Sequence, residues 1–145
     1  MDKKDDLDLQ SFLPYLLAQA AEASSLSFQQ VYKGRYGLLR TDWRVLFHLG
    51  QNGRMTAKEI GDRARTHKTK VSRAVRRLEE RRFLTRTRDQ NDRRSEHLEL
   101  TAAGVAAYRD LREVAAAYEK TLIRQFSPQD VALLRRMLQK LAGAG

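Results

Sequence analysis

Residues 56–100 combine two short helical patterns with a hairpin pattern, and this segment restricts the fold more than any other part of the chain. At about 100° per residue, one side of the second helix carries four apolar residues, which are Val71, Ala74, Val75 and Leu78. This side is expected to face a core. The opposite side and its margins carry cations and hydroxyls, which are Thr69, Lys70, Ser72, Arg73, Arg76 and Arg77.

The polar side of this helix has the side chains that DNA recognition uses. Arginine can bond bidentately to guanine, and serine and threonine can bond to phosphate or to bases. The pattern therefore indicates a helix for the major groove. A row of charges on a helix is more often only solvated, so the helix by itself leaves this alternative open. Its neighbours in the sequence favour DNA binding.

The residues before the basic helix predict another helix that meets it through a tight turn. Thr56 and Glu59 fit a capping box, in which the hydroxyl and the carboxylate bond to backbone amides at a helix start. Ile60 and Ala64 then give this helix an inner face. Because only residues 65–67 remain for the connection, the two helices are expected to form a helix-turn-helix.

The residues after the basic helix predict a two-stranded hairpin with a basic tip. Residues 84–88 and 97–100 alternate between apolar and polar side chains, as half-buried strands do. Between them, residues 89–94 are rich in turn-forming residues and end in Arg93 and Arg94. A hairpin that projects beside a helix-turn-helix is a wing.

Together these elements resemble the MarR family of bacterial winged-helix transcription regulators. The matching residues are Val71-Ser72-Arg73, Arg77-Leu78-Glu79, Asp92-Arg93-Arg94 and Leu100-Thr101-Ala102-Ala103-Gly104. The resemblance, which covers nearly the whole chain, implies a mainly α fold with a small β-hairpin wing. We expect a single domain over residues 1–145, with a winged helix-turn-helix lobe at 41–100 and dimerisation helices at 10–33 and 101–143.

The resemblance also implies roles for individual residues. It places the six polar residues of the basic helix, from Thr69 to Arg77, in the major groove. It makes Arg93 the wing-tip side chain that enters the minor groove, where narrow A·T-rich tracts have a strong negative potential. Arg94 is grouped with the DNA-binding residues, although it is expected to hold the shape of the wing together with Asp92.

The chain departs from the family pattern at the two ends of the basic helix. Arg82 stands where the family usually has glycine, so it must either adopt a left-handed conformation, at a cost of about 1 kcal/mol, or end the helix differently. His67 stands where a serine or aspartate cap is more usual. The cap is therefore expected on Thr66, or on His67 itself, which is otherwise a candidate phosphate contact.

The positive charge is concentrated in the same segment. Residues 53–97 carry 15 Lys or Arg and 7 Asp or Glu, which is +8 of the total net charge of +10. A basic block in a nearly neutral scaffold indicates a polyanionic partner, here double-stranded DNA. The chain has no Cys, which excludes disulfides and the cysteine-based peroxide sensing that one branch of the resembled family uses.

Catalytic and membrane functions have little support in the sequence. His48, His67 and His97 are scattered over different predicted elements, and there is no Gly-rich phosphate loop or metalloprotease motif. We therefore expect no enzyme activity, no metal site and no cofactor. No apolar run approaches the ~20 residues that span a bilayer, and residues 1–6 do not read as a signal sequence. A cytoplasmic protein without membrane contact is expected.

The remaining helices predict a homodimer. Helical spacing runs over residues 10–33, with Pro14 in the first turn, over 42–50, with Thr41 as N-cap, over 101–125, and again from Pro128. The first helix and the last two have more apolar surface than the winged helix can cover. A second copy would cover it, with a monomer as the alternative. Two-fold symmetry then favours a near-palindromic operator.

A cluster of aromatic and basic residues suggests an effector site. The candidate ligand-binding residues are Tyr32, Tyr36, Arg40, Trp43, Phe47, His48 and Tyr108. Aromatic walls with an arginine would suit an aromatic acid, which resembling proteins often accept. Alternatively, Trp43 and Phe47 are only core residues that hold the second helix.

These observations indicate a homodimeric, sequence-specific repressor that a small ligand releases from a palindromic operator. Two alternatives use the same elements. A non-sequence-specific architectural protein would show little preference for a palindrome over random duplex, and a protein-interaction module would lack strong salt dependence in binding DNA.

Overall fold

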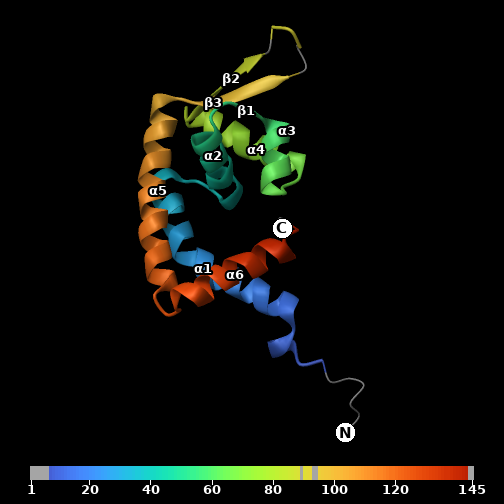
Figure 1. Cartoon of the computed structure of the whole chain (residues 1–145). Coiled ribbons are helices and arrows are strands. Elements are labelled where there is room, and N and C mark those ends of the chain that lie inside the picture. The colour runs from blue at the N-terminus through green and yellow to red at the C-terminus, as the bar shows by residue number, and fades with distance from the viewer. Residues whose placement is uncertain (1–6, 89, 93–94, 144–145) are drawn as a thin grey trace. The chain divides into compact units, whose positions relative to one another are not determined.

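The computed structural model describes residues 7–88, 90–92 and 95–143, and this part of the chain is mainly helical (Figure 1). The helices are α1 (Leu13–Tyr36), α2 (Arg40–Asn52), α3 (Ala57–Ala64), α4 (Lys68–Glu80), α5 (Ala102–Ile123) and α6 (Pro128–Leu141), and a short 3-10 helix covers Leu9–Ser11. The chain divides into two compact units, Met1–Arg112 and Glu113–Gly145. None of the helices in the described ranges is long and apolar enough to cross a membrane.

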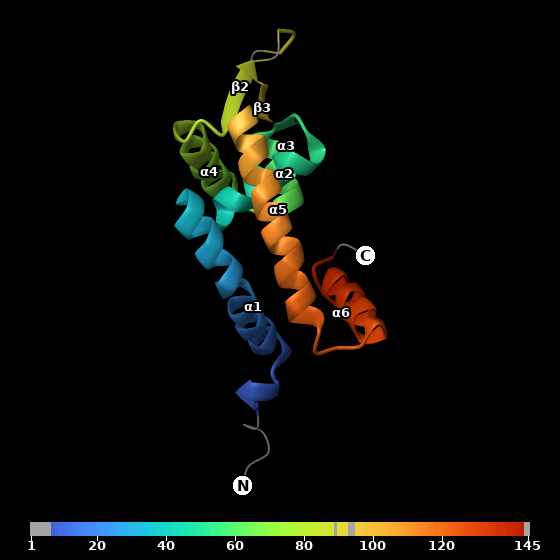
Figure 2. The ribbon, with the colours of Figure 1, turned by 90° about the vertical axis from the view of Figure 1, so that its left-hand side faces the viewer.

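The strands form one antiparallel sheet in the order β1-β3-β2. β2 (Leu84–Arg88) pairs with β3 (Glu96–Leu100) in the register that aligns Arg86 with Leu98. Figures 1 and 2 show these strands leaving the helices as a projecting hairpin, which agrees with the predicted wing. The short strand β1 (Met55–Thr56) was not expected, and it pairs with β3 on its other side.

The core of the winged helix lies where α2, α3, α4 and the sheet meet. Its fully buried side chains include Leu46 from α2, Ile60 from α3, Leu78 from α4 and Leu84 and Leu98 from the sheet. These side chains meet in one interior because apolar residues alternate along the strands and recur every three or four positions along the helices. This interior holds α4 with one face inward.

Local hydrogen bonds begin both helices of the helix-turn-helix. The predicted capping box is confirmed, because the Glu59 amide donates to Thr56 Oγ1 and the Thr56 amide donates to Glu59 Oε1, each at 3.1 Å. The cap of α4 is His67, whose Nδ1 accepts from the Thr69 amide at 3.2 Å. Thr66 is not the cap, since its hydroxyl donates to the carbonyl of Ala64.

After the end of α4, Arg82 adopts the left-handed backbone conformation, which was one of the two expected possibilities. Arg82 has a φ of 62°, and the Phe83 amide returns to the carbonyl of Leu78 at 2.9 Å. The carbonyl of Arg82 accepts from Thr101 Oγ1 at 2.7 Å. This hydrogen bond ties the helix end to the residue that precedes α5, and it helps to offset the conformational cost of about 1 kcal/mol.

Two predicted helix boundaries are wrong. The first helix runs to Tyr36 rather than residue 33, and it ends at Gly37, which has a φ of 65°. The second helix begins at Arg40, so Thr41 is not its cap. The physical reason is Asp42, whose Oδ2 accepts from the Leu39 amide at 2.8 Å and so begins the helix after Leu39.

Residue 104, in the first turn of α5, must be glycine because the backbone of Phe83 lies against it. Thr101 Oγ1 accepts from the Gly104 amide at 3.0 Å, which caps the first turn of α5. A Cβ atom on residue 104 would overlap the backbone carbonyl of Phe83. Glycine therefore allows α5 to start directly against the chain that leaves α4.

Candidate nucleic-acid interface and neighbouring cavities

The two faces of α4 divide as the helical periodicity predicts. The four apolar residues, which are Val71, Ala74, Val75 and Leu78, are buried. Thr69, Lys70, Ser72, Arg73 and Arg76 are exposed. Arg76 pairs with Glu80 at 3.4 Å, but both side chains are mostly solvent-exposed, and such pairs contribute little. The helix therefore presents a basic surface that is free to meet a ligand.

Arg77 makes a different contact from the one expected. Its Nη2 lies 2.8 Å from Asp42 Oδ1, and its Nε donates to both carboxylate oxygens at 2.9 and 3.0 Å. Asp42 is fully buried, and the Arg77 side chain is 30% exposed. The guanidinium is thus turned toward the first turn of α2 and joins that helix to α4. Sequence reasoning missed this role of Asp42, because its partner lies 35 residues away.

Charged side chains also hold the wing to the end of α4. Arg86 on β2 lies 3.2 Å from Glu79 of α4 and 3.3 Å from Glu96 of β3. The sequence pattern did not identify these partners of Arg86. Near the hairpin tip, Asp92 Oδ2 accepts from Ser95 Oγ at 3.1 Å. The predicted wing-tip residues Arg93 and Arg94 lie outside the described residues.

Most of the predicted effector residues belong to an aromatic cluster. Phe28, Tyr32, Trp43 and Phe47 pack edge to face or tilted, with ring centroids 5.2–6.3 Å apart. Tyr108 of α5 joins the cluster through Phe47 at 5.2 Å. Tyr32 is 1% exposed, and burial raises the pKa of its hydroxyl, an effect that the Arg40 guanidinium opposes. Tyr32, Trp43, Phe47 and Tyr108 are thus brought together as packed side chains.

Tyr36 is directed away from this cluster. Its hydroxyl donates to Asp110 Oδ2 at 2.5 Å, and Arg35 Nη1 donates to both oxygens of Asp110 at 2.9 Å. Burial and the bond to Asp110 raise the pKa of Tyr36. The same bond from Tyr36, followed by Arg35, lowers the pKa of Asp110. These contacts join the end of α1 to α5.

His48 lines a separate small cavity of about 320 Å³. The lining residues are Trp43, Arg44, Phe47, His48, Gln51 and Ala64. Burial lowers the pKa of His48, and the cations Arg63 and Arg44 lower it further. The uncharged imidazole is therefore favoured at neutral pH.

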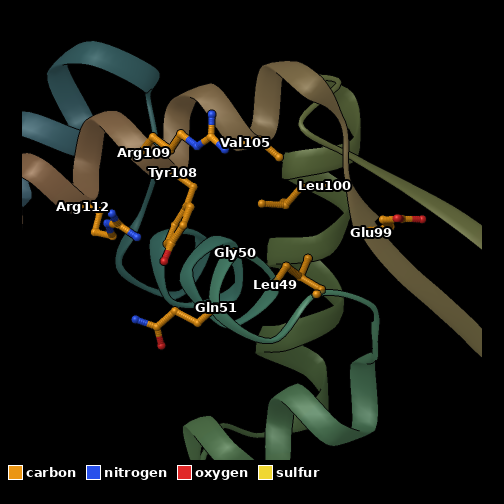
Figure 3. A pocket seen from close by; sticks show the side chains of 10 residues that line it. Leu49, Gly50, Gln51, Glu99, Leu100, Val105, Tyr108, Arg109 and Arg112 are labelled. Carbon is orange, nitrogen blue, oxygen red and sulfur yellow. The ribbon is translucent and has the colours of Figure 1, made fainter.

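A larger cavity, of about 630 Å³, opens between α2, β3 and α5 (Figure 3). Its lining is Leu49, Gly50, Gln51, Gly53, Glu99, Leu100, Val105, Tyr108, Arg109 and Arg112. Tyr108 is only 7% exposed, and its hydroxyl has no hydrogen-bond partner among the described residues. The guanidinium of Arg112 lies 5.9 Å from the centre of its ring. Figure 3 shows Arg112, Tyr108 and Gln51 at the same end of the pocket.

Of the predicted effector residues, only Tyr108 lines this larger cavity. The sequence identified Tyr108 as a candidate ligand-binding residue, but it gave no sign that Arg109 and Arg112 would border a cavity beside α2. The volume is within the roughly 300–1,000 Å³ usual for small-molecule sites. The cavity combines apolar walls with two cations, one carboxylate (Glu99), an amide and a hydroxyl that has no partner among the described residues.

Comparison with known proteins gives the following similarities. A family model described as MarR family matches residues 36–95. The uncharacterized HTH-type transcriptional regulator YwoH of Bacillus subtilis is 30% identical over 95 residues, which cover 66% of this chain and 69% of YwoH. The homoprotocatechuate degradative operon repressor of Escherichia coli is 26% identical over 134 residues, covering 92% of this chain and 89% of the repressor.

The fold also has solved counterparts. The structure of Bordetella bronchiseptica BpsR, whose DNA binding is regulated by 6-hydroxynicotinic acid, has a TM-score of 0.86 at 21% identity. The alignment covers 95% of this chain and 98% of BpsR. At this identity the likeness supports the fold alone, and it confirms the predicted winged-helix architecture with its flanking helices.

Proposed function

The chain belongs to the MarR family of transcriptional regulators, and on this premise we propose that it is a homodimeric repressor of a palindromic operator. The observation that carries this proposal is the exposed basic face of α4. Arg73 and Lys70 have no ion-pair partner among the described residues, so their charges are available to DNA. The Escherichia coli relative is named a repressor, which supports the same direction of regulation.

Within this proposal the polar residues of α4 divide into two roles. Thr69, Ser72 and Arg73 meet base edges or nearby phosphates in the major groove, flanked by Lys70 and Arg76. Arg77 instead positions α4, because its guanidinium is already bonded to Asp42. From their places in the sequence, we keep Arg93 as the wing-tip residue for the minor groove and Arg94 as a wing residue that supports the shape of the wing.

The homodimer is supported by the uncovered apolar side chains of α6. Leu134, Met137, Leu138 and Leu141 are 40–63% exposed. Positions separated by three, four and seven residues fall on one face of a helix. An uncovered apolar face of this kind marks an interaction surface, and a second copy of the chain would cover it. We assign the regions accordingly, with α1, α5 and α6 for dimerisation and residues 40–100, from α2 to β3, for DNA.

Replacing Arg73 by alanine tests the DNA-binding proposal. The unmodified protein first selects its operator from a pool of random duplexes. If Arg73 reads a base, the variant is expected to lose about 1–3 kcal/mol of discrimination between this operator and random duplex. Fluorescence anisotropy with both duplexes measures the difference. Equal weakening on the two duplexes would show that Arg73 is only a phosphate contact. If the unmodified protein enriches no sequence from the random pool, a non-sequence-specific architectural protein is favoured.

We further propose that a small aromatic acid binds the 630 Å³ cavity and releases the protein from DNA. The apolar walls suit a ring, and Arg112 and the Tyr108 hydroxyl suit a carboxylate, because charged donors form the stronger hydrogen bonds to carboxylates. The regulation of BpsR by 6-hydroxynicotinic acid supports this ligand class. The proposal replaces the expected site around Tyr32 and Tyr36, since one is packed in the cluster and the other is bonded to Asp110.

Benzoate is the probe for this effector site. A ligand at a hundred times its Kd stabilises a protein by about 2.7 kcal/mol, so saturating benzoate is expected to raise the melting temperature and to weaken operator binding. Both effects should be lost in Arg112→Gln. They should persist in Lys120→Gln, which removes the same charge from α5 outside the cavity. Equal stabilisation of the two variants would rule out a carboxylate at Arg112.

A further inference from the structure

The first turn of α2 and one side of α4 border an open cavity of about 430 Å³, which we call the α2–α4 cleft. Its lining is Gln29, Leu39, Arg40, Thr41, Lys70, Arg73 and Arg77. Lys70, Arg73 and Arg77 are three and four residues apart, so they form one row along α4. Arg40 and Thr41 approach this row from α2. Four cations from two helices therefore border a single small space.

Bonds on the inner side of the cleft fix the distance between its two walls. Asp42, which follows Thr41, accepts from Arg77 of α4 and from the amide of Leu39. The carboxylate is fully buried and faces a guanidinium at 2.8 Å. Because this pair joins α2 to α4, Arg40 and Thr41 are held beside Lys70 and Arg73 before any ligand arrives.

The charge in the cleft is not neutralised by the protein. Among the described residues no Asp or Glu lines the cleft, and neither Lys70 nor Arg73 has an ion-pair partner. Arg77 is compensated by Asp42. Arg40 lies 3.7 Å from Glu22, with the two side chains 47% and 73% exposed, and its guanidinium also approaches the hydroxyl of Tyr32, whose raised pKa leaves it uncharged at neutral pH. Since an exposed pair of this kind contributes little, three cations remain available to an anion.

We propose that the α2–α4 cleft binds a backbone phosphate of the DNA duplex, with Arg40 and Lys70 as its charged ligands. The inference rests on the proposed DNA-binding function and extends it beyond α4 and the wing. Arg73 lines the cleft and also belongs to the exposed face of α4. A duplex that docks on this face therefore passes its backbone along the cleft. The contact positions the duplex but reads no base, and it assigns Arg40 to DNA rather than to the effector.

The experiment compares the full-length protein with two variants, Arg40→Gln and Glu22→Gln, on the selected operator and on random duplex. Arg40→Gln is expected to weaken binding to both duplexes by a similar factor, about tenfold or more. It should also lower the slope of log K against log salt by roughly 1 for each lost contact. Glu22→Gln removes the competing carboxylate, so binding should tighten about twofold. Arg124→Gln removes a charge outside the cleft and should leave the slope unchanged.

The outcomes separate this inference from the function on which it rests. If the unmodified protein binds duplex without salt dependence, the proposed function itself fails. If it binds with a steep slope that Arg40→Gln leaves unchanged, the cleft assignment alone is overturned. A free anion is distinguished by melting the protein in inorganic phosphate. If phosphate stabilises the unmodified protein but not Arg40→Gln, while the variant binds DNA with unchanged affinity, the cleft is a small-anion site. This result would contradict the proposal. Unchanged circular dichroism of the variants checks the fold.

Discussion

Replacing Arg77 by alanine is expected to lower the free energy of unfolding by about 3–5 kcal/mol, the usual cost of breaking a buried ion pair by removing one partner. The remaining carboxylate of Asp42 is fully buried and would lose the guanidinium that lies 2.8 Å away. Among the described residues, only the Leu39 amide would still donate a hydrogen bond to it. Urea denaturation followed by circular dichroism measures the change.

Arg73→Ala is the matched control for this prediction. Arg73 is on the same helix and has the same charge, but it is exposed and has no ion-pair partner in the described ranges. Its replacement should change the free energy of unfolding by no more than about 0.5 kcal/mol while it impairs DNA binding. Similar stability of the two variants would show that Arg77 does not hold α2 to α4. The double variant Asp42→Ala/Arg77→Ala should lose less stability than the two single losses combined.

Replacing Leu134 by glutamate is expected to produce a monomer with greatly weakened DNA binding. Leu134 is 40% exposed in the single chain and lies in the apolar row of α6. A glutamate there would carry a charge into the proposed interface, where burial of an unpaired charge is costly. A monomer engages one half-site, and the loss of the second half-site costs about 10²–10⁴ in affinity. Sedimentation velocity and anisotropy measure the two effects.

Gln139→Glu adds the same charge to α6, about 140° around the helix from Leu134 by the usual 100° per residue. This variant should remain a dimer and should bind the operator with nearly unchanged affinity. A Leu134→Glu protein that stays dimeric would place the interface elsewhere. A monomeric variant with undiminished affinity would remove the link between dimerisation and operator recognition.

Features that depend on neighbours in the sequence were predictable. The capping box at Thr56 and Glu59 involves atoms three residues apart, and it has the expected bonds. The inner face of α4 follows from helical periodicity, and Val71, Val75 and Leu78 are buried as predicted. In both cases the physical cause operates within one or two helical turns.

Features that depend on distant partners were not predictable. The pairing of Asp42 was not predicted, because the pattern does not reveal that Arg77 reaches it from another helix. The strand β1 is only Met55–Thr56, too short to show alternation, and it exists because β3 offers an open edge. Arg86 alternates like any strand residue, and its bonds to Glu79 and Glu96 appear only in the folded hairpin.

The effector residues illustrate the same difference within one cluster. Trp43 and Phe47 are four residues apart on α2 and meet as expected, at 5.2 Å. Tyr36 is close to them in sequence but points elsewhere, and Arg40 approaches the cluster at the Tyr32 hydroxyl. The Tyr36 hydroxyl reaches Asp110 of α5, and Arg40 lines the α2–α4 cleft. Proximity along the chain indicated a shared region but not the direction of each side chain.

The most direct test of the central claim is the affinity of the unmodified protein for its selected operator between 50 and 200 mM salt. If the two α4 helices and two wings of a dimer neutralise about six to ten phosphates, the affinity of the dimer for its operator should fall by roughly 10³–10⁵ over this range. Sedimentation should find two chains on each duplex. An affinity that does not change with salt, or one chain per operator, would contradict the claim that a pair of these basic faces grips the DNA.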